Sequence, residues 1–340
     1  MRNLQTIMLS MAVLVAGSIP GLAQSKWDVT KTVHIGGDGG WDYLTVDSQT
    51  HRLFVTRSTH TMAIDATSGK VLGDIPGQKR SHGTAVVPAV GRGFITDGGG
   101  DGAILIFDLK TYSVLGKLAT MPDSDGILYD EGQNLVLAVS GDGNKLMTFR
   151  PDIDPVNGKI DAPIELGGAP EFFAADGTGK VYIALEDKDT VAVVDLKTRQ
   201  VTARWPVAPG GHPTGMAIDK KNHLLFIGCR NPQKLIVMST EDGKIVADLP
   251  IGAGVDAVKT DGDRAFASCG DGSLTVVDRK DGKFEVEEVV KTPLGARTMG
   301  VDHSTHTLYL PTAEMQPPAP GQRRPTPKPD TFMIVEVGKQ

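Results

Sequence analysis

An internal repeat constrains the fold of this chain more than any other feature of its sequence. Seven times between Leu44 and Leu310, an apolar stretch leads into a polar turn and a second apolar stretch rich in β-branched and aromatic residues. An Asp-like anchor marks each copy, at Asp47, Pro88, Asp130, Asp176, Asp219, Asp261 and Asp302, so that neighbouring copies are 41 to 46 residues apart. A period of this length is typical of one four-stranded sheet per repeat.

Each copy has the strand and turn pattern of an antiparallel sheet. Gly/Asp turns such as 98–102 and 270–272 follow the second strand, and the third strand often ends on Asp, as in Val193-Val194-Asp195. Glycine supplies the left-handed backbone conformations that such turns require. One twisted sheet cannot bury both of its faces, so the copies must stack around an axis. We therefore predict an all-β fold, a seven-bladed β-propeller of four-stranded antiparallel blades.

The two ends of the repeat array predict how the propeller closes. The last copy ends after its third strand, at 332–337, and a strand-like segment at 29–35 precedes the first copy. We expect the N-terminal strand to complete the last blade, because this pairing removes an open sheet edge. Residues 24–340 then form a single domain. Since aromatic residues make up only 5% of the sequence, we expect mostly aliphatic packing between blades.

Residues 1–23 have the pattern of a secretory signal peptide. Arg2 precedes an apolar stretch at 7–17, and Gly21-Leu22-Ala23 offers the small residues that a signal peptidase requires. We expect cleavage near Ala23 and a periplasmic or secreted bacterial protein, and the apolar stretch is too short for a good membrane span. Loss of Arg2 lowers the 35 basic residues to 34 against 41 acidic ones, a formal charge of −7. This charge argues against nucleic acid as a partner, and we expect a monomer.

The two cysteines occupy matching positions in neighbouring copies. Cys229 ends the stretch Phe226-Ile227-Gly228-Cys229, and Cys269 ends Phe266-Ala267-Ser268-Cys269. Export permits a disulfide, but neighbouring second strands usually hold the two Cα atoms beyond the bridging limit of about 7 Å. Two buried free thiols are therefore the favoured interpretation. Neither cysteine belongs to a haem-attachment or zinc motif.

Acidic residues recur five positions before the anchors. These seven positions hold Asp42, Gly83, Asp125, Glu171, Thr214, Asp256 and Arg297. His82 stands one residue before Gly83, and His212 stands two residues before Thr214. In a propeller this position lies where each inner strand enters the central channel, so the pattern predicts a ligand site at one channel mouth, formed by the four acids, the two histidines and Arg297.

Carboxylates that converge on a narrow channel repel one another, so they favour a divalent cation, a bound basic group or protonation of some members. The candidate metal ligands are Asp42, Asp125, Glu171 and Asp256, and their oxygen atoms suit Ca²⁺ or Mg²⁺. His82 or His212 would widen the choice towards a transition metal. Alternatively, the acids are hydrated, or paired with Arg297 and loop lysines, without a specific ligand.

A second set of histidines lies at the opposite ends of the inner strands. His51, His223 and His306 each stand four residues after an anchor Asp, in the turn between the first and second strands. We interpret the pattern as a turn-stabilising contact between Asp and His.

A Pro-rich insertion at 311–331 distinguishes the last copy. So many prolines predict polyproline-like or disordered conformations instead of a strand ladder. The insertion joins the second and third strands, so we expect it on the same face as the acidic mouth. Arg323, Arg324 and Lys328 would form a basic lid over the mouth, or the loop would dock a partner. The simplest alternative is a tolerated surface insertion.

The repeat resembles a known family. Pro213-Thr214-Gly215-Met216-Ala217-Ile218-Asp219, Leu225-Phe226-Ile227 and Val193-Val194-Asp195 are similar to the YVTN-type β-propeller repeat of YncE-like exported bacterial proteins. The resemblance covers nearly all of the mature chain and implies a propeller fold. It does not select a function, because similar propellers include lactonases, subunits of quinoprotein dehydrogenases and surface-layer proteins.

The sequence favours a scaffold that binds a ligand or a protein, because it contains no nucleophile-and-base motif and no phosphate-binding glycine loop. A metal-assisted, lactonase-like hydrolase is the enzymatic alternative. In it the cation would polarise a lactone carbonyl, and His82 or His212 would act as base. The second alternative is a docking subunit of an exported redox enzyme.

Overall fold

The computed structural model describes residues 26–318 and 325–340 and shows an all-β protein. The expected signal peptide at 1–23 and the lid residues Arg323 and Arg324 lie outside the described residues. Two short 3₁₀ turns, η1 (Pro88–Val90) and η2 (Glu186–Lys188), interrupt the strands. Within the two described ranges, no helix has the length and apolar character needed to cross a membrane.

The strands form antiparallel sheets whose order follows the chain. Four sheets of four strands run through the middle and the end of the repeat array. They contain β9 (Ser124–Asp130), β10 (Leu135–Ser140), β11 (Lys145–Phe149) and β12 (Ile164–Glu165); β13 (Pro170–Ala175), β14 (Lys180–Leu185), β15 (Thr190–Asp195) and β16 (Gln200–Pro206); β17 (Pro213–Asp219), β18 (Leu224–Arg230), β19 (Gln233–Ser239) and β20 (Ile245–Leu249); and β21 (Val255–Asp261), β22 (Arg264–Cys269), β23 (Ser273–Lys280) and β24 (Lys283–Lys291).

The remaining strands form a seven-stranded sheet, another four-stranded sheet and a small hairpin. The seven-stranded sheet contains β2 (Leu44–Asp47), β3 (Arg52–Thr56), β4 (Ser58–Asp65), β5 (Val71–Val87), β6 (Arg92–Asp97), β7 (Ala103–Asp108) and β8 (Val114–Ala119). The other four-stranded sheet has the order β1 (Trp27–His34), β29 (Met333–Lys339), β26 (Thr307–Thr312) and β25 (Gly300–Asp302). The hairpin pairs β27 (Met315–Gln316) with β28 (Thr326–Pro327).

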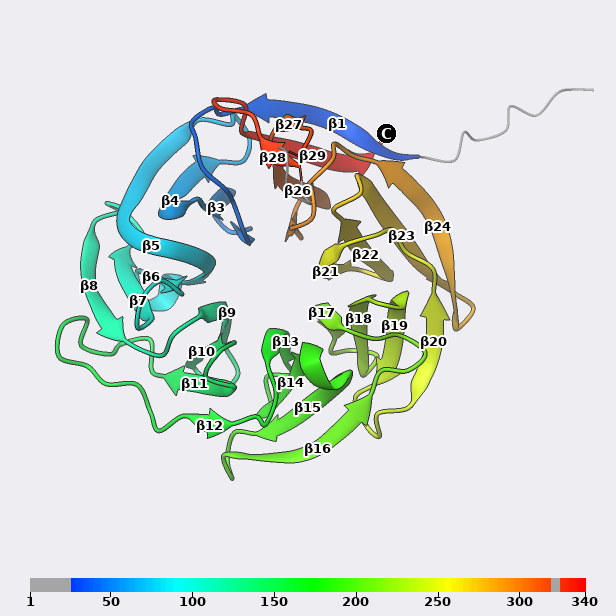
Figure 1. Cartoon of the computed structure of the whole chain (residues 1–340), viewed down its shortest axis with the longest axis horizontal. Helices are drawn as coiled ribbons and strands as arrows, with labels where there is room; N and C mark the ends of the chain where they lie inside the picture. The colour runs from blue at the N-terminus through cyan, green and yellow to red at the C-terminus, as the bar shows by residue number, and fades with distance from the viewer. Residues whose placement is uncertain (1–25, 319–324) are drawn as a thin grey trace, which may run out of the picture.

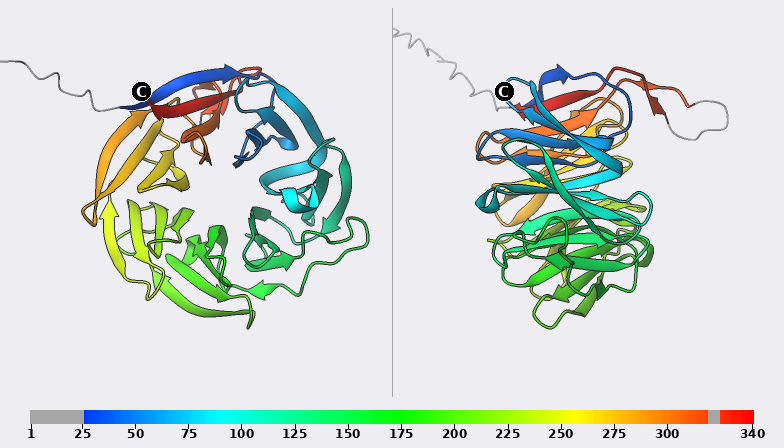
Figure 2. Two further views of the ribbon diagram at one scale, coloured as in Figure 1. Left: turned by 180° about the vertical axis from the view of Figure 1, so that it is seen from behind. Right: turned by 90° about the vertical axis from the view of Figure 1, so that its left-hand side faces the viewer.

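The sheets stand around a common axis, which makes the molecule a β-propeller. Figure 1 shows β9, β13, β17 and β21 next to the centre of the ring, with β12, β16, β20 and β24 at its rim. Neighbouring inner strands contact one another: β13 contacts β17, and β17 contacts β21. Figure 2 shows the same ring from behind and edge-on. The inner strands therefore lie side by side around the axis of the ring.

Strand β5 belongs to two successive repeats. Its first part pairs with β4, where Ile75 faces Thr61, and its last part pairs with β6, where Ala85 faces Phe94. Between these parts Gly77 has a positive φ of 97°, which a residue with a side chain rarely adopts. The copies anchored at Asp47 and Pro88 therefore share one continuous sheet, whereas the sequence predicted two separate ones.

The predicted pairing of the two ends of the repeat array is confirmed. Strand β1 lies antiparallel to β29, with Val33 opposite Ile334 and Trp27 opposite Lys339. The Trp27 side chain is buried, and its ring meets Phe266 of β22 edge-on at 5.0 Å between centroids. The N-terminal strand therefore both completes its own sheet and packs against the preceding one.

The hydrophobic core lies between sheets, and it is mostly aliphatic as predicted. One cluster joins Phe226 and Val237 of the β17–β20 sheet to Val258 and Ala267 of the β21–β24 sheet, all nearly or completely buried. Equivalent clusters fill the other contacts between neighbouring sheets. Each fully buried aliphatic side chain contributes about 1.5–3 kcal/mol, so the many contacts between sheets stabilise the ring.

Two of the three histidines of the first turns, His51 and His306, make contacts with Asp, and these contacts connect neighbouring sheets. His51, His223 and His306 all have positive φ, between 50° and 57°. Nδ1 of His51 lies 2.9 Å from Oδ2 of Asp302, and Nδ1 of His306 lies 2.6 Å from Oδ2 of Asp261. Asp261 is the anchor of the repeat before that of His306, and Asp302 is the anchor of the last repeat, whose strand β25 contacts β2 of the first. The predicted Asp–His contact therefore exists for His51 and His306, where it links two sheets instead of closing its own turn.

The two cysteines lie in matching strands of neighbouring sheets, Cys229 in β18 and Cys269 in β22. Both thiols are free and buried, as the sequence favoured. Burial raises the pKa of each to about 12, so neither is a reactive thiolate at neutral pH.

The Pro-rich insertion forms a short ladder near its two ends, which corrects the expectation of a chain without pairing. Met315 faces Pro327 and Gln316 faces Thr326. Proline keeps its carbonyl as an acceptor, so it can occupy an edge position of a two-stranded hairpin. The edge-on view in Figure 2 shows this hairpin extending from one face of the ring.

Candidate functional site

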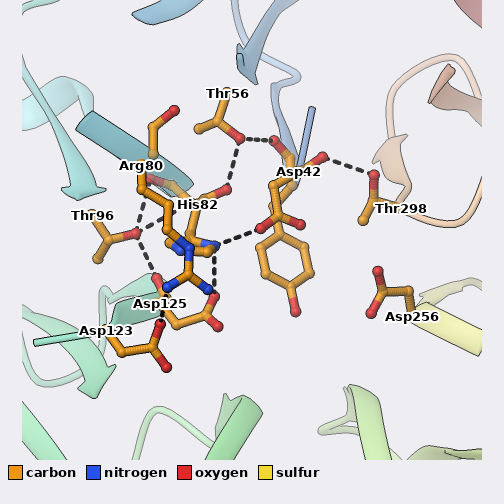
Figure 3. Close-up of polar contacts among 12 residues, drawn as sticks. Asp42, Thr56, Arg80, His82, Thr96, Asp123, Asp125, Asp256 and Thr298 are labelled. Carbon is orange, nitrogen blue, oxygen red and sulfur yellow. Dashed lines mark hydrogen bonds and ion pairs between the residues drawn. The ribbon is translucent and has the colours of Figure 1, made fainter. Parts of the chain in front are cut away.

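The inner strands bring the four predicted acids to one end of the channel. Asp125, Glu171 and Asp256 are the second residues of β9, β13 and β21, and Asp42 stands two residues before β2. Burial, together with the charges of all four carboxylates, raises the pKa of Tyr43 well above its usual value. The buried phenol of Tyr43 is therefore close enough to all four carboxylates to be affected by their charges. Figure 3 shows Asp42, Asp125 and Asp256 around a common space.

Asp42, His82 and Asp125 form the tightest group. Nδ1 of His82 donates a hydrogen bond of 2.6 Å to Oδ2 of Asp42 and lies 3.6 Å from Oδ1 of Asp125. One donor atom from each residue lies within 4.8 Å of the other two. Figure 3 shows His82 between the two carboxylates. In the described part of the chain, this is the group whose spacing fits a single metal ion.

His82 is buried between the two acids Asp42 and Asp125. Its side chain is 9% exposed. Its Nε2 has no hydrogen-bond partner among the described residues and lies against Gly98, where an added Cβ would sit 3.0 Å away. Burial lowers the pKa of His82, but the hydrogen bond to Asp42 and the charge of Asp125 outweigh it and raise the pKa overall.

Asp256 is not in this group, because two arginines hold it. Nε of Arg297 and a terminal nitrogen of Arg230 each lie 2.6 Å from a different oxygen of Asp256. The carboxylate is 7% exposed, whereas both guanidinium groups remain about one-third exposed. Arg297 also approaches Asp42 at 3.7 Å, so this arginine joins the two groups. Asp256 therefore orients a pair of arginines at the mouth.

Glu171 lies on the other side of Arg230, at 3.8 Å, with Glu186 as its neighbour. Burial, a hydrogen bond with Glu186 and the charge of Asp125 raise the pKa of Glu171 to about 9. His212 does not reach the central group: its half-exposed ring lies 3.3 Å from Glu186. The predicted four-acid ring is therefore divided into a histidine-centred group and a group organised by arginines.

Sequence reasoning missed several charged residues of the mouth. Arg230 ends the second strand of its sheet, and Glu186 follows the second strand of the preceding sheet. Arg80 lies in β5 and pairs at 2.9 Å with Asp123, which precedes β9. An alignment of the residues that end each second strand would have identified Arg230 and Glu186, because those ends reach the same face as the starts of the inner strands.

A cavity of about 540 Å³ opens beside the arginine pair. Arg230, Arg297 and Trp41 line it together with Met315, Pro325 and Pro327 of the insertion hairpin. The insertion hairpin therefore lies on the same face as the acidic mouth, beside the arginine pair. Lys328 does not extend over the mouth as a free charge, because it forms an exposed ion pair with Glu314 at 2.9 Å.

The described side chains at the mouth carry more acid than base. Three arginines (Arg80, Arg230 and Arg297) stand among six carboxyl groups (Asp42, Asp123, Asp125, Glu171, Glu186 and Asp256). Burial, followed by the charges of Asp42 and its acidic neighbours, raises the pKa of Asp125 to about 7 despite the opposing effect of His82. A cation at Asp125 would relieve this repulsion.

Comparison with known proteins places the chain by its fold. No family model matches the sequence, and no curated protein matches it either. Among solved structures, RRP9 WD40 repeats align with a TM-score of 0.77 at 12% identity, over 93% of this chain and 100% of that one. U3-55K gives 0.73 at 12% identity, over 91% and 99%.

A third similar structure, Kuenenia stuttgartiensis hydrazine synthase, aligns with a TM-score of 0.70 at 13% identity, over 82% of this chain and 94% of that one. Likeness at this level of identity shows the architecture alone. The chain is therefore a β-propeller whose site must be interpreted from its own residues.

Proposed function

We propose that this protein is an exported β-propeller that binds a divalent metal ion at the acidic mouth of its channel and serves as a binding scaffold. The observation that carries the proposal is the Asp42–His82–Asp125 group, in which three donor atoms lie within 4.8 Å of one another. Two carboxylates and one imidazole nitrogen are a ligand set that proteins use for metal ions.

The ligand atoms of this group limit which metal ions it is expected to bind. Ca²⁺ and Mg²⁺ take oxygen ligands, which Asp42 and Asp125 provide, whereas the Nδ1 atom of His82 favours a transition metal. Nδ1 of His82 donates its proton to Asp42 in a hydrogen bond of 2.6 Å. A metal ion would replace this proton, so metal binding is expected to strengthen as pH rises. We therefore favour a transition metal ion over Ca²⁺ or Mg²⁺.

The test is the metal content of mature protein, purified without chelator or immobilised nickel and measured by inorganic mass spectrometry. We expect about one bound ion per chain, which Asp125→Asn removes because it deletes one anionic ligand. Asp152→Asn is the matched control, since Asp152 is exposed and lies away from the mouth. A metal-free wild-type protein whose unfolding does not respond to added Mn²⁺, Zn²⁺, Ca²⁺ or Mg²⁺ would contradict the proposal.

The lactonase-like alternative is less well supported by this geometry. A hydrolytic base must reach the substrate, but Nε2 of His82 is covered beside Gly98 and Nδ1 is bonded to Asp42. The alternative would then depend on His212, whose half-exposed ring is beside Glu186. A screen of lactones with metal-loaded wild type and His212→Ala would detect this activity.

The wider assignment rests on the repeat. We infer seven blades, because the seven-stranded sheet contains two sequence copies joined through β5 and each other four-stranded sheet contains one. The likeness to YncE-like proteins is supported by the stretch Pro213–Asp219, which forms the inner strand β17. Export is supported by the sequence of 1–23, and N-terminal sequencing of protein from periplasmic extract tests it. A docking role for the insertion or for a redox partner rests on no contact in the described residues.

A further inference from the structure

A second cavity occupies the channel beyond the acidic mouth. It has a volume of about 410 Å³ and is lined by residues from the middle and the end of the inner strands, among them Phe172, Met216 and Lys259. Phe172 lies 4.9 Å from the ring of Tyr43, the tyrosine that the acids surround. One ring of this aromatic pair therefore lines the cavity, and the other lies among the acids of the mouth.

Lys259 is an ammonium group without a charged partner in this cavity. It lies in β21, three residues after Asp256, and its Nζ is 5.0 Å from the centroid of Phe172. No described carboxylate forms an ion pair with it, and the only cause of its altered pKa, lowered to about 8, is burial. An isolated ammonium in a partly apolar cavity is poorly solvated, and an anion would stabilise it.

The other ionisable residues that line the cavity also include more basic groups than acidic ones. Lys220 lies at its exposed rim, and His303 also lines it, whereas Asp130 is the only carboxylate among the lining residues. His303 is already paired with Asp261 at 3.1 Å. The charge of Lys220 acts on Asp130, so Lys259 is the basic group of the lining that has no acidic partner among the described residues. The lining of this cavity therefore carries more basic than acidic groups, in contrast to the mouth.

We propose that this cavity binds a small organic anion, whose carboxylate or similar group pairs with Lys259 and whose apolar body packs against Phe172 and Met216. The volume lies within the range of about 300–1,000 Å³ that is usual for ligand pockets. This site is separate from the proposed metal site, and the two can be tested independently.

The experiment is isothermal titration of mature protein with 2-naphthoate, with uncharged 2-naphthylmethanol as the comparison ligand. Saturable naphthoate binding is expected, and Lys259→Met should weaken it by about tenfold or more, because it removes a charge-assisted contact. Lys259→Arg should retain binding. Lys291→Met is the matched control, since Lys291 is exposed and distant from the cavity.

Two results would overturn the proposal. One is the absence of saturable naphthoate binding to wild-type protein that circular dichroism shows to be folded. The other is binding that survives Lys259→Met but is lost in Arg297→Met, which would assign the anion to the arginine pair at the mouth. Metal content is measured on the same variants, so that loss of the metal site is recognised separately.

Discussion

At the scale of the single residue, burial determines the charge of Glu171. A carboxyl group whose pKa is raised to about 9 keeps its proton in the folded protein at neutral pH, whereas the unfolded chain releases it above its usual pKa of about 4.5. The folded state therefore binds more protons between these values, and the contribution of Glu171 to stability falls as pH rises through this window.

We predict that Glu171→Gln removes this pH-dependent loss. Wild type and variant should have equal free energies of unfolding near pH 4, and the variant should be more stable by about 1–3 kcal/mol near pH 8. Urea denaturation at both pH values measures the difference. Glu241→Gln, at an exposed site, should leave stability unchanged at either pH. A stability difference for Glu171→Gln that did not vary with pH would contradict this account of its charge.

Asp256 matters through its ion pairs, because it is the nearest counter-charge of both Arg230 and Arg297. We predict that Asp256→Asn costs about 3–5 kcal/mol of unfolding free energy, since it leaves two partly buried guanidinium groups facing each other. Asp248→Asn is the matched control: Asp248 forms an exposed pair with Lys234, and its loss should cost less than about 1 kcal/mol. Chemical denaturation distinguishes the two, and equal costs would contradict the role of Asp256 at the centre of the arginine pair.

At the scale of the element, the strand β1 stabilises two sheets through one side chain. We predict that Trp27→Ala lowers the free energy of unfolding by about 3–5 kcal/mol, because it removes a buried ring that packs on Phe266. Val246→Ala, at a half-exposed site of β20, should change it by about 0.5 kcal/mol or less. Thermal and urea unfolding provide the comparison. A small effect at Trp27 would mean that β1 is held by its ladder alone.

The elements were predictable from sequence to the extent that they repeat. Every copy has the same order of apolar stretches and turns, so the sheets and the pairing of β1 with β29 followed from the pattern. The continuity of β5 did not follow, because Gly77 looks like any other turn glycine and its φ depends on how the two sheets pack. The ladder between Met315 and Pro327 does not follow from the sequence, because a high proline content disfavours strand pairing in general but leaves edge positions open.

Part of the site was predictable because it repeats with the strands. The prediction failed for residues that come together only when neighbouring sheets pack against each other. The positions five residues before the anchors identified Asp42, Asp125, Glu171 and Asp256, which all surround Tyr43. Arg230 was missed because it meets Asp256 only when one sheet lies beside the next. The division of the acids into two groups is a consequence of that contact, and no spacing within one repeat contains it.

At the scale of the whole molecule, the two thiols report on the integrity of the ring. Cys229 and Cys269 are buried in matching strands, and burial raises the pKa of each to about 12. We predict that a thiol reagent such as 5,5′-dithiobis(2-nitrobenzoate) modifies neither in native protein and both in denaturant. Rapid reaction of one thiol without denaturant would show that one sheet opens independently of the others.

The pairing of β1 with β29 also sets an order in time. Ribosomes produce residue 27 about 300 residues before its partner Lys339, so the first strand of the ring waits for the last one before it can pair. Contacts between such distant residues are slow to form, because a long loop of chain must be closed first. A chain still in synthesis therefore lacks its completed final sheet. The strand that ties the two ends of the ring together is thus the last one to be made, and the open sheet edge of β26 stays unpaired until then.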